Sequence, residues 1–148
     1  MRRLFYVMII RKYNETELET VFTIYQQTHC AEYFKEVQIA DFQIFEGIVQ
    51  DEEIHVALIG DQIIAFISVY PPQSFVHYLY VLPDFQKRGA GRALLQHIRN
   101  IYDSPLSLKC ERINKPAIKF YEEMGWKLFD KGSENDGTEY ILLTLDFE

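Results

Sequence analysis

Cysteine is scarce in this 148-residue chain, which contains only Cys30 and Cys110. Two cysteines form no disulfide framework, and both are interpreted as reduced thiols in the core of a cytoplasmic protein. A nucleophilic Cys110 would require a neighbouring base and a lowered pKa, and a sequence shows neither.

Long apolar runs are also absent, since none approaches the ~20 residues of a membrane-spanning helix. The start, MRRLFYVMII, imitates a secretory signal peptide, but its apolar part is short and no small-residue cleavage site follows. We therefore interpret it as an extension of the first strand, with Met8 as an alternative start to Met1. No membrane partner is expected.

Positive charge is in short supply, because the formal net charge at pH 7 is -7. An acidic chain is poorly suited to a polyanion, so no nucleic-acid partner is expected. The four histidines are too scattered for the ligand spacing of a metal site, and no metal is expected. Hydrophobic residues make up 48% of the chain, enough for the core of a single domain over residues 1–148.

Hydrophobic periodicity predicts strands and helices in the order βα(α)βββαβαββ. Gly60-Asp61 between two apolar runs predicts a tight antiparallel hairpin, and Asn14 and Asn114 are predicted to cap helices. Hairpins mixed with crossovers predict an α/β fold with a mixed sheet and helices on both faces. The expected strands are 9–13, 54–59, 62–70, 76–82, 106–110, 126–129 and 140–145, and the expected helices are 14–30, one or two within 33–50 (capped by Asp41, with Ile44, Phe45 and Ile48 on one face), one ending near Tyr102, and 114–125.

The stretch VHYLYVLPDFQKRGAGRALL, residues 76–95, organises the chain. An apolar run of seven residues broken only by His77 is typical of a central strand buried on both faces, and Pro83 ends it. Gly89 and Gly91 then open a helix whose N-terminus carries a positive partial charge. Backbone N–H groups left unshielded by glycine at such a helix start suit a phosphate or pyrophosphate.

A glycine pair alone is weak evidence, and it has three interpretations. A P-loop would require Gly-Lys-Ser/Thr after its second glycine, whereas Arg92 and Ala93 follow here. A dinucleotide fingerprint would require a third glycine, which is missing. In the third interpretation, the glycines only allow the chain to turn into the helix. The charged side chains nearby would then be ordinary solvated residues: Lys87, Arg88 and Arg92.

Two separated motifs resemble those of the GNAT superfamily of N-acetyltransferases. The run QKRGAGRA, residues 86–93, follows the strand end LYVLP and resembles the superfamily's acetyl-CoA motif Q/R-x-x-G-x-G/A. Downstream, N-x-x-A-x-x-F-Y-x-x-x-G-W from Asn114 to Trp126 resembles a second element of the superfamily. The resemblance covers the chain from about Ile9, and it implies a mostly antiparallel sheet of about 6–7 strands.

The resemblance implies acetyl-CoA as co-substrate. Its pyrophosphate would lie on backbone N–H groups of the glycine loop, and its pantetheine would pair with the preceding strand like an added strand. Neighbouring strands would splay apart there to leave room. The residues expected to bind acetyl-CoA are Leu79, Tyr80 and Val81 in the strand, Lys87, Arg88, Gly89, Ala90, Gly91 and Arg92 in the loop, and Asn114 before the last helix.

Within the resemblance, Tyr121 is the candidate general acid, because a phenol can protonate the departing thiolate of CoA. By spacing alone, Tyr121 would be a packing residue of its helix. Several superfamily members carry a glutamate base on the preceding strand, where this chain has Lys109. His77 is the candidate base in its place, directly or through water, with Glu111 and Tyr80 as weaker options.

The predicted function is transfer of an acetyl group from acetyl-CoA to a primary amine of a small molecule or a protein, by direct attack in a ternary complex. One alternative is a non-catalytic module that binds or senses acyl-CoA, because the general base is not assigned. A nucleotide-binding oxidoreductase is another, although its third glycine and acidic ribose partner are missing. Acidic residues between 122 and 139 would attract a basic acceptor or simply keep the surface soluble. The many tyrosines allow a homodimer without locating its interface.

Overall fold

The computed structural model describes residues 7–29 and 38–146. The predicted N-terminal strand extension over residues 1–6 and Cys30 lie outside the described residues. The order of elements confirms the predicted series. The elements are β1 (Met8–Lys12), η1 (Glu15–Glu17), α1 (Leu18–Thr28), α2 (Phe42–Ile48), β2 (Glu53–Ile59), β3 (Gln62–Tyr70), η2 (Pro71–Gln73), β4 (Phe75–Val81), η3 (Pro83–Phe85), α3 (Ala90–Ile101), β5 (Leu106–Glu111), α4 (Lys115–Glu123), β6 (Lys127–Ser133) and β7 (Glu139–Leu145).

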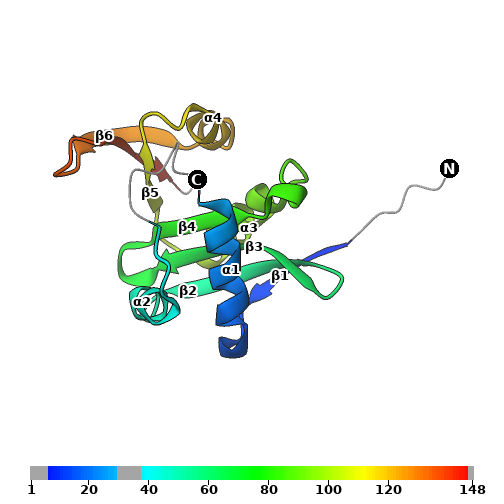
Figure 1. Cartoon of the computed structure of the whole chain (residues 1–148). Coiled ribbons are helices and arrows are strands. Elements are labelled where there is room, and N and C mark those ends of the chain that lie inside the picture. Colours follow the sequence, from blue (N-terminus) through cyan, green and yellow to red (C-terminus); the bar gives the residue numbers. More distant parts are fainter. Residues whose placement is uncertain (1–6, 30–37, 147–148) are drawn as a thin grey trace.

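The strands form one seven-stranded sheet in the order β1-β2-β3-β4-β5-β7-β6. Every neighbouring pair is antiparallel except β4 and β5, which are parallel. The Gly60-Asp61 hairpin joins β2 and β3 as predicted, and Gly60 adopts the positive φ of 60° that such a turn requires. The sheet is therefore mixed and mostly antiparallel, with β4 at its centre (Figure 1).

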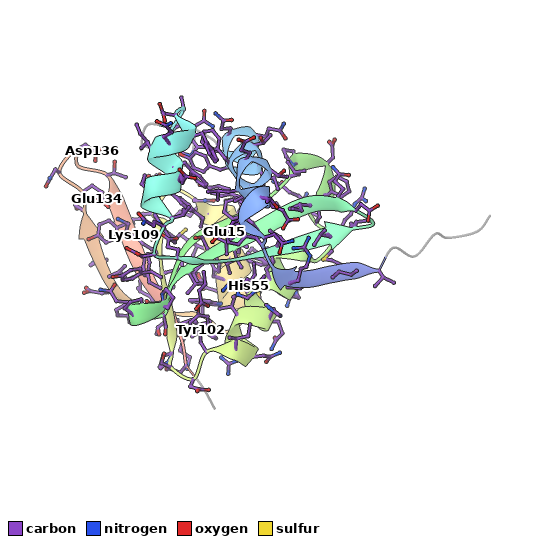
Figure 2. The ribbon with its side chains drawn as sticks, turned by 90° about the horizontal axis from the view of Figure 1, so that it is seen from below. Glu15, His55, Tyr102, Lys109, Glu134 and Asp136 are labelled. Atoms are coloured by element: carbon purple, nitrogen blue, oxygen red, sulfur yellow. The ribbon has the colours of Figure 1, made fainter. Side chains whose placement is uncertain are left out.

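Helices cover both faces of the sheet and give it two hydrophobic cores. One core lies under α1 and α2, where Val21, Phe22 and Tyr25 pack against the sheet. The other lies under α3 and α4, and includes Leu94 and Ile98. Figure 2 shows α1 and α2 on one side of the strands and α3 on the other. This arrangement arises because each helix has one apolar face, which is stabilised by packing against a face of the sheet.

Local signals at helix starts are confirmed. Asn14 and Glu17 form a capping box ahead of α1, and the Asn14 amide donates to Glu17 Oε1 at 2.8 Å. Asp41 Oδ1 accepts from the amides of Gln43 and Ile44 and so caps α2. These caps satisfy amides that have no partner within the helix.

Of the three residues predicted on one face of α2, only Phe45 is buried. Ile44 is 57% exposed and Ile48 is 40% exposed, whereas Phe45 is fully buried with Val49 one turn later. The helix is only seven residues long, so its hydrophobic periodicity alone does not determine which of its apolar residues face the core. The packing of Phe45 against Phe22 decides its rotation.

The closing hairpin is longer than predicted, since β6 runs from Lys127 to Ser133. Trp126 is buried but precedes the strand, and the apolar residues Leu128 and Phe129 are more than half exposed. β6 is an edge strand of the sheet, and nearly all of its residues are exposed.

A buried histidine lies on the α3 side of the sheet. The ring of His55 is 6% exposed, and His97 Nε2 lies 3.1 Å from His55 Nδ1. Burial first, and then the neighbouring His97 and Lys12, lower the pKa of His55 to about 4, although Glu53 opposes them. Figure 2 shows His55 on the same side of the sheet as Tyr102, which follows α3.

We expect this histidine to make the fold sensitive to acid. Because the pKa of His55 is below the ordinary 6.5 in the folded state, the unfolded chain binds more protons between pH 6.5 and about 4. The free energy of unfolding should fall across that window by about 1 to 3 kcal/mol. Urea denaturation at pH 7.0 and 4.5 measures the fall, and His55→Gln should remove most of it. An equal fall in the variant would contradict this origin.

Candidate active site

The two central strands of the sheet, β4 and β5, pair over a very short distance. Only Phe75 with Ser107 and Val76 with Leu108 are in register, although both strands continue for several residues. Figure 1 shows β5 turning away from β4. The divergence of neighbouring strands that the sequence resemblance implied is therefore present.

The backbone of β4 beside this divergence has no strand partner. The Leu82 amide donates to a carbonyl of β3 at 2.9 Å, and backbone groups alternate sides along a strand. Leu79 and Val81 therefore direct their N–H and C=O groups to the side that β5 has left. The Val81 carbonyl accepts a hydrogen bond from Gln86 Nε2 at 3.1 Å. Backbone groups of this kind can pair with an extended ligand.

The loop after β4 leads directly into the start of α3. Lys87 and Gly89 both have positive φ, of 64° and 89°, so the chain turns sharply twice within three residues. Gly89 is the N-cap of α3 and has no side chain with which to bond the first helical amides. The first free amides of a helix carry a positive partial charge and are suited to binding an anion.

The side chains of this loop add positive charge around the helix start. Lys87, Arg88 and Arg92 are exposed, and the Arg88 guanidinium lies 5.3 Å from the centre of the Phe85 ring. A Cβ on Gly91 would lie 3.5 Å from the Phe120 ring, an ordinary contact. Of the two glycines, only Gly89 is therefore required by backbone conformation.

Helix α4 places the second motif against the α3 side of the sheet. Asn114 Oδ1 accepts from the Ala117 amide at 3.2 Å, so Asn114 caps the helix as predicted. Tyr121 packs edge-on against Phe120 and Trp126 and contacts the core beneath α3 and α4. Burial raises the pKa of Tyr121 well above its ordinary 10.0, with the neighbouring Cys110 as a second cause. The phenol is therefore fully protonated at neutral pH.

His77 lies at an irregularity of β4. The register with β3 shifts between Ser68, which pairs with Tyr78, and Val69, which pairs with Val76, so His77 has no partner residue. This bulge is why His77 is exposed, and it contradicts the prediction of a continuously buried strand. The His77 ring stacks on Tyr78 with their centres 3.9 Å apart.

The structure brings Glu52 to His77, a partner that the sequence analysis missed. Glu52 Oε2 lies 2.6 Å from His77 Nδ1, and Ser68 Oγ donates to the other carboxylate oxygen. The Glu52 side chain is only 6% exposed. It lies in the acidic run Asp51-Glu52-Glu53, whose last residue begins β2, and no sequence signal separates it from its neighbours.

Lys109 lies on β5, at the position where the sequence resemblance implies a glutamate base, and its side chain has partners of its own. Its ammonium pairs with Glu134 and lies 4.7 Å from the centre of the Tyr140 ring. Lys109 and Glu134 lie side by side at the β6–β7 end of the sheet (Figure 2). This ion pair neutralises one of the acidic residues between positions 122 and 139. The attraction of that region for a basic acceptor is correspondingly weaker.

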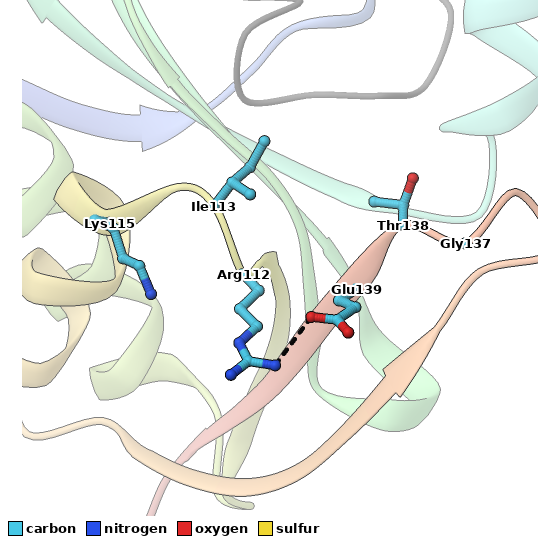
Figure 3. A pocket seen from close by; sticks show the side chains of 6 residues that line it. All are labelled: Arg112, Ile113, Lys115, Gly137, Thr138 and Glu139. Atoms are coloured by element: carbon cyan, nitrogen blue, oxygen red, sulfur yellow. Dashed lines mark hydrogen bonds and ion pairs between the residues drawn. The ribbon is translucent and has the colours of Figure 1, made fainter.

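A hollow of about 430 Å³ lies between the start of α4 and the β6–β7 turn. Arg112 Nη1 donates to Glu139 across it at 2.9 Å, as the dashed line in Figure 3 shows. Lys115 lies on the side of α4. The lining residues are Arg112, Ile113, Lys115, Gly137, Thr138 and Glu139.

The structure thus gathers most of the predicted site on one region of the sheet. Leu79, Val81 and the loop over residues 87–92 adjoin the divergence of β4 from β5, whereas Tyr80 directs its ring into the core under α1. Ligand binding by these residues stays a prediction. Within residues 7–29 and 38–146, no three His, Cys, Asp or Glu side chains are grouped to hold a metal ion. None of the described helices is long and apolar enough to cross a membrane.

Comparison with known proteins defines the class. The model of the acetyltransferase (GNAT) family matches residues 18–126, and the chain belongs to this family. It is a transferase by family, and its seven-stranded sheet is the fold that this family shares.

Individual relatives agree with this assignment. Peptidyl-lysine N-acetyltransferase YiaC of Escherichia coli K12 is 30% identical over 69 residues, which span 47% of this chain and 46% of that protein. The ribosomal-protein-S18-alanine N-acetyltransferase of Escherichia coli superposes with a TM-score of 0.76 at 21% identity, covering 95% of this chain and 94% of that one. A GCN5-related N-acetyltransferase of Rhodopseudomonas palustris superposes with a TM-score of 0.80 at 16% identity, covering 99% and 100%.

Cys110 should be chemically inert in the folded protein. Burial raises its pKa to about 11, with Glu111 as a second cause. At pH 8 such a thiol holds roughly 100-fold less thiolate than one at the ordinary 9.0. In a Cys30→Ser variant, we expect iodoacetamide to modify Cys110 at least about 100-fold more slowly in the folded protein than in urea. Comparable rates would restore Cys110 as a candidate nucleophile.

Proposed function

We propose that this protein transfers an acetyl group from acetyl-CoA to a primary amine by direct attack in a ternary complex. The observation that carries the proposal is the stretch of β4 at Leu79 and Val81 that has no strand partner on the β5 side and that leads to the uncapped start of α3. A ligand with an extended amide chain that ends in a pyrophosphate matches these two features in the order in which they occur: the amide chain beside β4 and the pyrophosphate at the start of α3. The assignment to the acetyltransferase family supports the same ligand.

The cofactor would be held mainly by main-chain groups. Its pyrophosphate would accept from amides between Lys87 and Arg92, and the exposed basic side chains there would balance its charge. Its pantetheine amides would pair with Leu79 and Val81, as a further strand would. The thioester would then lie beside the middle of β4, where a free backbone N–H could stabilise the oxyanion of the tetrahedral intermediate.

The proposed reaction forms one C–N bond and breaks one C–S bond. The acceptor amine, with an ordinary pKa near ~10.4, must lose a proton before or during attack on the carbonyl carbon. His77 is the proposed base, acting directly or through water, and it is about one-third exposed on β4. Collapse of the intermediate expels the thiolate of CoA.

Tyr121 is the proposed acid that protonates this thiolate. Its raised pKa keeps the proton on the phenol until a base such as a thiolate forms beside it. The same burial makes Tyr121 a weaker acid, so the transfer requires the sulfur to come close to the hydroxyl. The tyrosinate would regain a proton from solvent once the product has left the site.

The proposed acceptor is a small-molecule amine or a protein amino group. The partial similarity to a peptidyl-lysine N-acetyltransferase favours a lysine side chain among these. The hollow beside Arg112 and Glu139 lies at the end of the sheet where β6 and β7 turn, and it offers both signs of charge to an incoming chain.

The cofactor site can be tested by calorimetry. We expect saturable binding of acetyl-CoA and none of NAD. Gly89→Ala should weaken acetyl-CoA binding about fivefold to tenfold, because the free loop can relieve a strain of about 1 kcal/mol at positive φ by moving its amides, and binding must restore that strain. Gly60→Ala is the matched control, since Gly60 also has positive φ and open space around it but lies in the β2–β3 turn. Equal affinities for both variants would contradict the loop as the site.

The acid can be tested by kinetics. Tyr121→Phe should lower kcat for amine acetylation about 100-fold while leaving the calorimetric Kd for acetyl-CoA unchanged, because only proton transfer is lost. Tyr102→Phe is the matched control, as Tyr102 is also partly buried with a raised pKa but bonds Glu53 instead. If no amine in a broad screen releases free CoA from the wild-type protein, the non-catalytic binding module is the better description.

A further inference from the structure

We infer that Glu52 is a positioning residue that holds His77 ready to accept a proton, an inference that rests on the proposed function. Three elements meet at this point: the turn between α2 and β2 carries Glu52, β3 carries Ser68, and β4 carries His77. Twenty-five residues separate Glu52 from His77, so only the folded sheet brings them together.

The position of the Glu52 carboxylate is fixed by hydrogen bonds from its backbone and to both of its side-chain oxygens. Its backbone amide donates to the Val49 carbonyl at 3.0 Å, which ties the turn to the end of α2. One carboxylate oxygen accepts from Ser68, whose side chain is fully buried, and the other meets His77. A carboxylate that is 6% exposed and bonded through both oxygens has little freedom to turn away.

These contacts define which nitrogen of His77 carries the proton. An ionised carboxylate only accepts hydrogen bonds, so both of its partners must be donors. Nδ1 of His77 therefore carries a hydrogen, and in the neutral ring Nε2 is left with the lone pair. Stacking on the Tyr78 ring restricts the rotation of the His77 ring. The His77 side chain is about one-third exposed. Nε2 is thus the atom that can take a proton from an incoming amine or water.

The negative charge also bears on the state after proton transfer. When Nε2 accepts a proton, the ring becomes an imidazolium whose Nδ1–H already points at Glu52, 2.6 Å away. A buried carboxylate beside a developing cation stabilises it without any rearrangement. Lys109 stands at the position on β5 where the sequence resemblance implies a glutamate base, so the proposed base and its partner would both lie on the β4 side.

Nuclear magnetic resonance tests the tautomer without reference to activity. In protein labelled with ¹⁵N-histidine, long-range ¹H–¹⁵N correlations should show His77 as a single Nδ1–H tautomer, with His77→Gln assigning the signals. Glu52→Gln should lose this preference, because an amide offers both donors and an acceptor and no longer dictates the proton's place. A neutral His77 that carries its hydrogen on Nε2 in the wild type would overturn the inference.

Kinetics test the consequence. Glu52→Gln should lower kcat roughly 10- to 100-fold, the range seen when a partner that orients a working histidine is removed. The Kd for acetyl-CoA should not change, since the proposed cofactor contacts lie elsewhere. Glu53→Gln is the matched control: Glu53 is the adjacent carboxylate, but it bonds Tyr102 and does not touch His77, so kcat should be preserved. Ser68→Ala keeps the charge and should cost far less than Glu52→Gln.

The outcomes separate this inference from the proposed function. If His77→Gln retains wild-type kcat, or the wild type binds no acetyl-CoA, the proposed function itself is wrong in its base or its cofactor. If His77→Gln abolishes turnover but Glu52→Gln changes neither the tautomer nor kcat, only the role of Glu52 is wrong. Loss of both turnover and the Nδ1–H tautomer in Glu52→Gln, with acetyl-CoA affinity intact, supports the inference.

Discussion

The structure depends above all on how briefly β4 and β5 pair. Two residue pairs hold the halves of the sheet together. Beyond Val76, β4 stays paired with β3 but has no neighbouring strand on its β5 side. Backbone N–H and C=O groups without partners are costly, so a fold keeps such an arrangement only where something else can meet them. The loop and helix start that follow β4 continue the same line of free donors, which is why we place an extended, anionic cofactor there.

A second irregularity of the same strand shapes the proposed chemistry. The bulge at His77 adds one residue to β4 relative to β3, and it releases a single side chain from the alternation of buried positions. Val76 and Tyr78 on either side still pack into the two cores. One strand thereby provides both a backbone edge that β5 leaves unpaired and an exposed imidazole. Glu52 meets that imidazole, and Ser68 on β3 donates to the other oxygen of Glu52.

The family fold and the details of the site vary independently. Solved acetyltransferases superpose closely on this chain at 16–21% identity, so the sheet order is kept while most side chains differ. Lys109 illustrates the difference, because a cation bonded to Glu134 stands where the sequence resemblance implied a glutamate base. The role of base is then free to pass to another strand, and function has to be argued from the side chains present rather than from the fold.

The sequence by itself determined the features that depend on neighbours along the chain. Helix caps at Asn14, Asp41 and Asn114, the Gly60 turn, the left-handed Gly89 and the order of elements all follow from residues within a few positions of each other. The two spaced motifs also identified the family. Tertiary structure alone decided the bulge at His77, the pairing of Glu52 with His77 and of Lys109 with Glu134, and the exposure of Ile44 and Ile48. These depend on strand register and on which helix face meets the sheet, and contacts between distant residues leave no periodic trace in the sequence.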